Sequence, residues 1–226
     1  MLRQARFWVP IGLLICCAIC LTAMALHTKD ENVTKPESVR MTTLRKAVSG
    51  YGSVDGRYQE EVIEVASTIP PKLGAALKGV EFINGCHPWM TRKLNHCPYG
   101  TYDPAGWSDD NSYGHDWSNS IWISSQAVEN KKTADVILHE IGHAATENLF
   151  DECYFPLQAE KSVKELLLQS FASHEAQASD LLADAFVIAF ATHAKDLHTH
   201  YFETFNFKAS KEIISKVRAA VWLCSL

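Results

Sequence analysis

The most regular hydrophobic pattern of the chain lies between residues 133 and 146. Its apolar residues recur three and four positions apart, as in a helix that buries one face in a core. They are Val136, Ile137, Leu138, Ile141, Ala144 and Ala145. Thr133 is a suitable N-cap for this helix, and the alternating segment 120–124 before it predicts a β-strand. The middle of the chain is therefore expected to be a strand followed by a buried helix.

The remaining pattern predicts further helices around a small sheet. Helices are expected over residues 37–48, 57–67, 72–78, 156–172, 175–193 and 208–223. A second strand is expected at 80–83. Residues 84–119 are rich in Gly, Asn, Asp, Pro and aromatic residues, and we expect them to form loops. The fold class that follows is α+β, mostly helical with a small sheet.

The N-terminal segment has the composition of a secretory signal peptide. Two arginines precede an uncharged run that ends in small residues suitable for cleavage after Ala25. An uncleaved membrane anchor is the alternative, because the uncharged stretch 7–26 approaches the ~20 residues that a spanning helix needs. With either outcome residues 26–38 form a linker and residues 39–226 a domain outside the cytosol. We expect a secreted or periplasmic protein, or a membrane-anchored one if residues 1–25 are retained.

The charge of the chain limits its partners. Cleavage would remove two arginines and no acid, which changes the formal net charge from −5 to −7. A mildly acidic protein is a poor candidate for binding nucleic acid. The remaining length suffices for one domain with a hydrophobic core.

Four of the seven cysteines lie outside the expected signal segment. An even number in an exported chain predicts two disulfides, for which there are three connectivities. We favour Cys86–Cys97, which closes a short loop, and Cys153–Cys224, which ties the C-terminal helix to the loop after the central helix. A metal site made of cysteines is the competing hypothesis, but these four include no Cys-x-x-Cys pair.

The central helix carries the sequence His139-Glu140-Ile-Gly-His143. Residues four apart share one face of a helix, so the two histidines are placed to supply two ligands of a catalytic zinc ion (Zn2+). Glu140 would lie beside the metal, where a carboxylate can accept a proton from water. The alternative is a helix with two solvated histidines, but the surrounding apolar residues do not fit a solvated face.

A catalytic zinc site needs a third protein ligand. Thr146 and Leu149 stand where the metzincin pattern has Gly and a third His, which excludes that class. Glu160 and Glu165 lie at the distance of a thermolysin-type ligand, but the sequence around them fits the solvated side of an amphipathic helix.

Asp180 is the preferred third ligand. Asp180 and Asp184 share one face of a helix that is otherwise apolar, and acids there are costly unless they are paired or bind a metal. Asp184 and Glu175 remain alternative ligands. A pair of surface acids in salt bridges is the interpretation that involves no metal.

Residues 120–146 and 175–190 resemble the catalytic domain of anthrax lethal factor and its relatives, a zincin metallopeptidase family. That family has a strand, a His-Glu-x-Gly-His helix and a later helix of the form Glu-x-x-Ala-Glu-Ala-Phe. The resemblance covers about half of the chain after the signal segment. It implies a zincin-like fold, with three zinc ligands at His139, His143 and Asp180 and a general base at Glu140.

The chain departs from that pattern at two positions. The third ligand is Asp rather than Glu, one methylene shorter, so its helix must approach the metal more closely. The tyrosine with which the family polarises the substrate carbonyl falls near His174, where the chain has no tyrosine. We therefore assign the polarisation of the substrate carbonyl to His174, with Tyr154, His198 and Tyr201 as alternatives.

These features together predict an exported zinc-dependent endopeptidase, which hydrolyses a peptide or protein substrate with metal-activated water and Glu140 as general base. The strand 121–123 is expected either to pair with an extended substrate or to be an ordinary core strand.

One alternative function is a catalytically silent zinc-binding domain, against which the intact Glu140 argues. Another is a secreted carbohydrate or cell-wall binding module. It would use the loop 96–119, which could also cover the cleft or bind calcium, although a disulfide-pinned surface loop describes it best.

Overall fold

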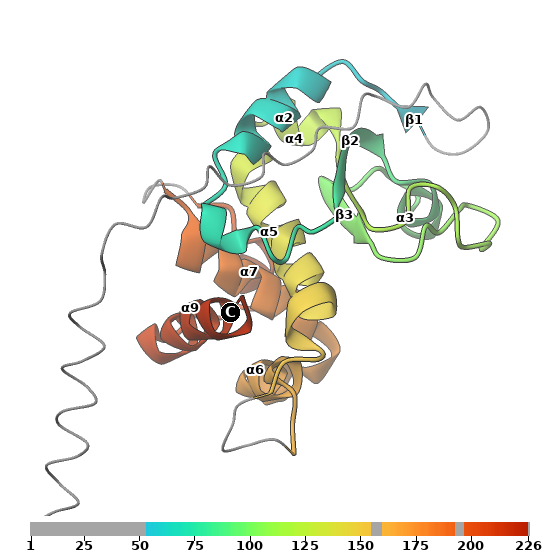
Figure 1. The fold of residues 1–226 in the computed structure, drawn as a ribbon. Coiled ribbons are helices and arrows are strands. Elements are labelled where there is room, and N and C mark those ends of the chain that lie inside the picture. Colours follow the sequence, from blue (N-terminus) through green and yellow to red (C-terminus); the bar gives the residue numbers. More distant parts are fainter. Residues whose placement is uncertain (1–52, 155–159, 193–196, 226) are drawn as a thin grey trace, which may run out of the picture. The chain divides into compact units, whose positions relative to one another are not determined.

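The computed structural model describes residues 53–154, 160–192 and 197–225 (Figure 1). The expected signal segment, the linker and the helix at 37–48 lie outside these residues. The described residues all belong to one compact unit, Ser38–Leu226. None of the described helices is long and apolar enough to cross a membrane.

A four-stranded sheet supports one side of this unit, with the strand order β1-β2-β4-β3. The strands are β1 (Ser53–Val54), β2 (Glu81–Cys86), β3 (Gly100–Asp103) and β4 (Ser120–Ile123). β4 runs parallel to β2 and antiparallel to β3. All four residues of β4 are buried.

Two of these strands were expected, whereas β1 and β3 were not. The predictions of β2 and β4 are confirmed, whereas β3 lies in a region expected to form loops. Of the two expectations for residues 121–123, the ordinary core strand is the one observed, because β4 lies between β2 and β3 in the sheet. Among the described strands β1 pairs only with β2 and β3 only with β4, so these two are the edge strands of the sheet.

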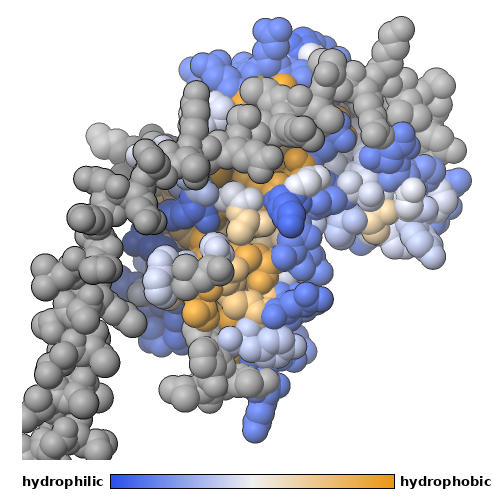
Figure 2. All heavy atoms as spheres, in the orientation of Figure 1, coloured by the Kyte–Doolittle hydropathy of each residue, from blue (hydrophilic) through white to orange (hydrophobic). Residues whose placement is uncertain are grey.

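Most of the helices lie to one side of the sheet, with α6, α7 and α9 farthest from it (Figure 1). They are α2 (Gln59–Ser67), α3 (Pro88–Leu94), α4 (Ser125–Glu129), α5 (Thr133–Ala145), α6 (Val163–Leu168), α7 (Ala178–Phe190), α8 (His200–Thr204) and α9 (Lys211–Cys224). Shorter or irregular helical segments are η1 (Pro71–Leu73), η2 (Thr146–Phe150), which continues α5 as a π-helix, and η3 (Gln169–Gln177). Figure 2 shows apolar residues near the centre of one face, in the area where Figure 1 places α7 and α9.

Several helix boundaries differ from the expected ones for local reasons. In the segment expected as a helix over 156–172, α6 begins at Val163 because Ser162 and Glu165 form a capping box. Glu165 is exposed, as expected for the solvated side of a helix, and its carboxylate also accepts the backbone N–H of Ser162. The segment expected at 72–78 has only the short turn η1, which begins after Pro70 and has Pro71 as its first residue.

The contact between α5 and α7 determines the distance between the two candidate ligand helices. A Cβ atom built on Gly142 would lie 2.7 Å from the Cα atom of Ala183, closer than real Cβ atoms come. The two helices therefore touch at a glycine and an alanine, one residue from His143 and three from Asp180. This is the closer approach that an aspartate ligand requires.

Both disulfides are present as expected. Cys86 and Cys97 have an S–S distance of 2.08 Å, and Cys153 and Cys224 one of 2.04 Å. The first joins the end of β2 to the segment before β3, and the second joins the end of α9 to the segment after η2. The fold is thus a mostly helical α+β unit with a small sheet and two disulfides, as the sequence predicts.

Candidate metal centre

His139, His143 and Asp180 converge on one point. His139 and His143 lie one turn apart on α5, and their Nε2 atoms are 3.2 Å apart. The Oδ1 atom of Asp180, on α7, lies 3.5 Å from Nε2 of His143. One ligand atom from each of the three residues lies within 4.8 Å of the other two. This group could hold a metal ion.

The spacing of these atoms fits a tetrahedral metal. Ligand atoms that bind a tetrahedral ion at ~2.0–2.1 Å are about 3.3 Å from one another. The two measured separations, 3.2 Å and 3.5 Å, lie on either side of that value. The third separation, between the ligand atoms of His139 and Asp180, is within 4.8 Å.

The other nitrogen of each imidazole is held by an oxygen atom. Nδ1 of His139 lies 2.8 Å from Oδ1 of Asp184, and Nδ1 of His143 lies 3.2 Å from Oγ of Ser179. An ionised carboxylate only accepts hydrogen bonds, so Nδ1 of His139 donates to Asp184 and Nε2 faces the site. The hydroxyl of Ser179 can donate or accept, so this contact orients the ring of His143 without fixing its tautomer.

Asp184 orients the site and does not belong to the ligand group. Its side chain is 1% exposed. One oxygen accepts the proton of His139, and the other accepts the backbone N–H groups of Tyr201 and Phe202 at 2.8 Å and 2.9 Å. A buried carboxylate that accepts a hydrogen bond from a ligand histidine is the usual support of a metal site. Of the alternatives to Asp180, Glu175 is exposed on η3 and also lies outside the group.

These neighbours shift the pKa values of two of the ligands. Burial disfavours the imidazolium of His139, but the hydrogen bond to Asp184 and the nearby acids outweigh burial and raise its pKa. Burial likewise disfavours the carboxylate of Asp180, but His143 and His139 outweigh burial and lower its pKa. The three candidate ligands and their neighbours therefore stabilise a positive charge that is placed between them.

Glu140 is 5% exposed and is held by β3. Its Oε2 atom accepts the backbone N–H of Tyr102 at 2.7 Å. A Cβ atom on Gly100 would lie 2.5 Å from Cγ1 of Val136 and 2.6 Å from Oε1 of Glu140, so only glycine permits this approach. The edge strand thus lies directly against the candidate general base.

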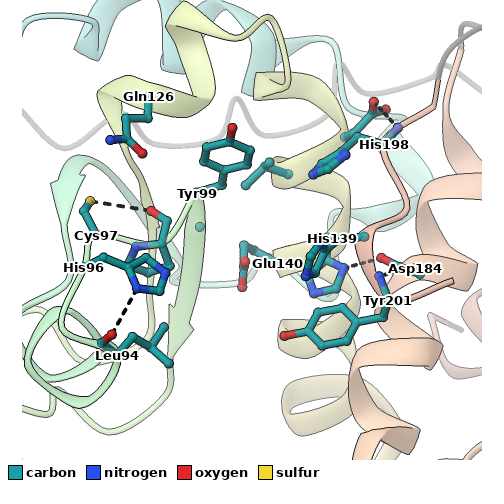
Figure 3. A pocket seen from close by; sticks show the side chains of 15 residues that line it. Leu94, His96, Cys97, Tyr99, Gln126, His139, Glu140, Asp184, His198 and Tyr201 are labelled. Atoms are coloured by element: carbon teal, nitrogen blue, oxygen red, sulfur yellow. Dashed lines mark hydrogen bonds and ion pairs between the residues drawn. The ribbon is translucent and has the colours of Figure 1, made fainter. Parts of the chain in front are cut away.

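A cavity of about 620 Å³ opens beside Glu140. Figure 3 shows Glu140 between two walls, one from the segment before β3 and the other from α5 and the segment that leads into α8. Its lining includes Leu94, Tyr99, Val136, His198 and Tyr201. Glu140 and the candidate ligand His139 line the same cavity, so a bound molecule can reach both.

Tyr201 lies at the metal group. Its ring stacks on that of His139, with centroids 5.6 Å apart and an angle of 13° between the planes. Its hydroxyl hydrogen-bonds with the carboxylate of Asp180. Burial, followed by the charge of Asp180, raises the pKa of Tyr201, so the hydroxyl keeps its proton at neutral pH and remains a donor.

His174 is not brought to this site. Its ring packs against Phe205 and Phe207, with centroid distances of 5.8 Å and 6.0 Å, and it does not line the cavity. Tyr154 is 51% exposed and pairs with Ser162 in an isolated bridge away from the cavity. The expectation that His174 replaces the family's tyrosine lacks structural support, because η3 directs this side chain towards the phenylalanines that follow α8.

The aromatic side chains of the loop 96–119 mostly pack against neighbours. Trp117 is 5% exposed and packs edge-on against Trp122. Trp107 packs between Trp89 and Tyr113, and of these three Tyr113 is the one that is largely exposed. Within the described residues, the acids of this loop form no group that meets the geometry of a metal site. A packed surface loop fits these contacts better than a row of aromatic rings open to a sugar.

Comparison of the chain with family models, curated proteins and solved structures found no match. The assignment of a function therefore depends on the geometry of this site.

Proposed function

We propose that this protein is a zinc-dependent endopeptidase. The observation that carries the proposal is the convergence of His139, His143 and Asp180 beside the buried Glu140, which lines the same cavity as His139. Two imidazoles and one carboxylate, with room for a further ligand, are typical of catalytic rather than structural zinc sites. A zincin-like identity of the fold belongs to the same proposal.

Each residue has a defined role in this mechanism. When bound, zinc acts as a Lewis acid towards water and the scissile carbonyl. Glu140 accepts a proton from the attacking water and delivers it to the leaving amine. The hydroxyl of Tyr201 donates a hydrogen bond to the oxyanion that develops on the carbonyl oxygen. Asp184 keeps the imidazole of His139 and the backbone of Tyr201 in place.

An extended substrate has a strand to pair with. β3 is the edge strand of the described sheet that contacts Glu140, through Gly100 and Tyr102. Addition of a peptide to a sheet edge satisfies its backbone groups and holds the scissile bond at a fixed depth. In this proposal β3, rather than residues 121–123, pairs with the extended substrate.

The two disulfides are compatible with an extracellular location. We accordingly propose that the peptidase is exported, as the N-terminal sequence predicts. A carbohydrate-binding function has less support, because the aromatic side chains of the loop 96–119 pack against one another.

The test separates metal binding from catalysis. Zinc content and cleavage of a peptide library are measured for the parent, for Glu140→Gln and for His143→Ala. We expect Glu140→Gln to retain zinc and to lose activity by ~10²-fold or more, and His143→Ala to lose both. Glu64→Gln, at an exposed position on α2, serves as the matched control and should behave like the parent. A Glu140→Gln protein that cleaves as fast as the parent would exclude this mechanism.

A further inference from the structure

Tyr102 connects the edge strand β3 to the helix of the metal ligands at two places. Its backbone N–H donates to Oε2 of Glu140 at 2.7 Å, and its hydroxyl lies 3.3 Å from Oδ1 of Asn148. Glu140 is on α5, and Asn148 is on η2, which continues α5 directly. One residue of β3 therefore contacts the helix beside the metal group and again further along.

The backbone N–H of Tyr102 points to the edge of β3 that is unpaired in the described sheet. β3 runs antiparallel to β4, and Ser124 after β4 donates its N–H to the carbonyl of Tyr99 at 2.9 Å. In an antiparallel ladder, residues with and without these hydrogen bonds alternate. Tyr102, three positions after Tyr99, is thus a residue without them, and its N–H is directed away from β4. The carboxylate of the candidate general base is held at the same edge that an extended substrate is proposed to use.

The hydroxyl of Tyr102 is anchored by two asparagines. It lies 3.0 Å from Oδ1 of Asn119 and 3.3 Å from Oδ1 of Asn148, so its one proton has two acceptors. Nδ2 of Asn148 donates to Oδ1 of Asn119 at 3.2 Å, and Nδ2 of Asn119 donates to the backbone carbonyl of Lys78 at 3.3 Å. Burial raises the pKa of Tyr102 to about 12, so the hydroxyl keeps its proton and remains a donor.

The π-helix η2 brings Asn148 to this contact. In an uninterrupted α-helix, a residue eight positions after Glu140 would point about 80° past it. A π-helix has more residues per turn, so each residue turns less far around the axis. Such segments are rare and often lie at functional sites. In this helix the π-helical segment keeps Asn148 nearer the face that carries Glu140 and meets β3.

We propose that Tyr102 is a positioning residue for the general base. Its hydroxyl fixes the place of β3 along α5 and η2 through Asn148 and Asn119. Its backbone N–H then holds the carboxylate of Glu140 in the orientation in which it accepts a proton from water. The inference rests on the proposed peptidase function and names a residue that acts through Glu140. Because the substrate is proposed to pair with the same strand, this one anchor places the base and the scissile bond relative to each other.

The main experiment measures kcat and KM of Tyr102→Phe on one peptide that the parent cleaves, with activity expressed per bound zinc. This variant keeps the backbone N–H and loses the anchor of the strand. We expect kcat to fall by ~3- to 10-fold, the effect of one hydrogen bond, with zinc content retained and KM little changed. Tyr113→Phe is the matched control and should equal the parent, because Tyr113 is 73% exposed on the loop 96–119.

The outcomes separate this inference from the proposed function. A parental kcat in Tyr102→Phe would overturn the inference and leave the peptidase function standing. A loss of zinc from Tyr102→Phe would show that this residue supports the metal group instead, and would also overturn it. A zinc-loaded parent that cleaves nothing would contradict the proposed function itself and remove this inference with it.

A second background distinguishes positioning from general support of the fold. Tyr102→Phe is combined with Glu140→Gln, which removes the base on which the anchor acts. If Tyr102 acts through Glu140, the residual activity of Glu140→Gln should not fall further. A further fall by the same factor as in the parent would show a structural role alone and would overturn the inference.

Variants of Asn148 test the anchor from its other end. Asn148 is exposed, so its replacement leaves the fold intact even if Tyr102→Phe impairs folding. Asn148→Ala should lower kcat as Tyr102→Phe does, and the double variant should be no slower than either single one. Asn148→Asp keeps an acceptor for the hydroxyl and should recover most of the loss. Equal kcat values for Asn148→Ala and the parent would overturn the role of this contact.

Hydrogen exchange of the Tyr102 amide checks the inference without turnover. The chain has seven tyrosines, so ¹⁵N-tyrosine labelling gives few signals, and the signal missing from Tyr102→Phe is that of Tyr102. We expect this amide to exchange at least ~10-fold faster in Asn148→Ala than in the parent, because its hydrogen bond to Glu140 is loosened. Asn148→Asp should exchange at nearly the parental rate. An unchanged rate in Asn148→Ala would overturn the inference.

Discussion

Replacement of Gly142 by alanine tests whether the contact between α5 and α7 holds Asp180 at the metal. The new Cβ atom would lie 2.7 Å from the backbone of Ala183, against ~3.5–4.0 Å for an ordinary contact between carbon atoms. The helices must then separate by about 1 Å. His143 and Asp180 sit on either side of this contact, so their present separation of 3.5 Å would exceed ~4 Å, which is too wide for a tetrahedral ion.

Gly142→Ala should lower the affinity for zinc more than it lowers the free energy of unfolding. Overpacking a core costs about 1–3 kcal/mol, and alanine recovers about 1 kcal/mol because it favours the helix more than glycine does. The net loss of unfolding free energy is therefore about 0–2 kcal/mol. Zinc affinity should fall more, by ~10- to 100-fold, as when the support of a metal ligand is disturbed.

Two assays on Gly142→Ala measure these costs separately. Chemical denaturation of the zinc-free protein gives the change in stability, and competition with a chromophoric chelator gives the change in zinc affinity. A variant that folds with nearly parental stability and binds zinc as tightly as the parent would refute the link between this contact and the ligand geometry.

Two further predictions concern the residues around the ligands. Asp184→Asn should weaken zinc binding by ~10- to 100-fold, because an amide cannot accept all three of the present hydrogen bonds; a parental affinity in the chelator competition would contradict this. Tyr201→Phe should retain zinc and lower kcat by ~10²- to 10³-fold with a smaller change in KM, while His174→Asn should leave both kinetic constants near parental values. Steady-state kinetics on one cleaved peptide decides between Tyr201 and His174, and a kcat reduced in His174→Asn alone would reverse the assignment.

The sequence predicted the parts of the site that depend on local spacing. The positions of His139, Glu140 and His143 follow from helical periodicity. Asp180 was found because an acid on an apolar helix needs a partner, and the cysteine pairs followed from their number and the loops they close. Each of these patterns is visible in a short segment or in a count.

The sequence did not predict the parts that depend on tertiary contacts. β3 is as short as β4 but lacks the alternation of apolar residues that identifies β4, and its edge position follows from the strand order. Tyr201 reaches the site because Asp184 binds the backbone at the start of α8, a contact between residues 17 positions apart in sequence. Gly100 and Gly142 lie within a strand and a helix, where a glycine can indicate that another part of the chain approaches the backbone closely. The sequence alone does not show which part approaches.

The most direct test of the central claim is hydrolysis of peptides by the zinc-loaded protein in water enriched in ¹⁸O. In the proposed mechanism water attacks one peptide bond, with the metal group and Glu140 beside it. Each new C-terminus should therefore carry one ¹⁸O atom, and the labelled products should be at least ~10²-fold less abundant with Glu140→Gln at the same zinc occupancy. Absence of labelled products from the parent, or equal amounts from parent and variant, would contradict the account.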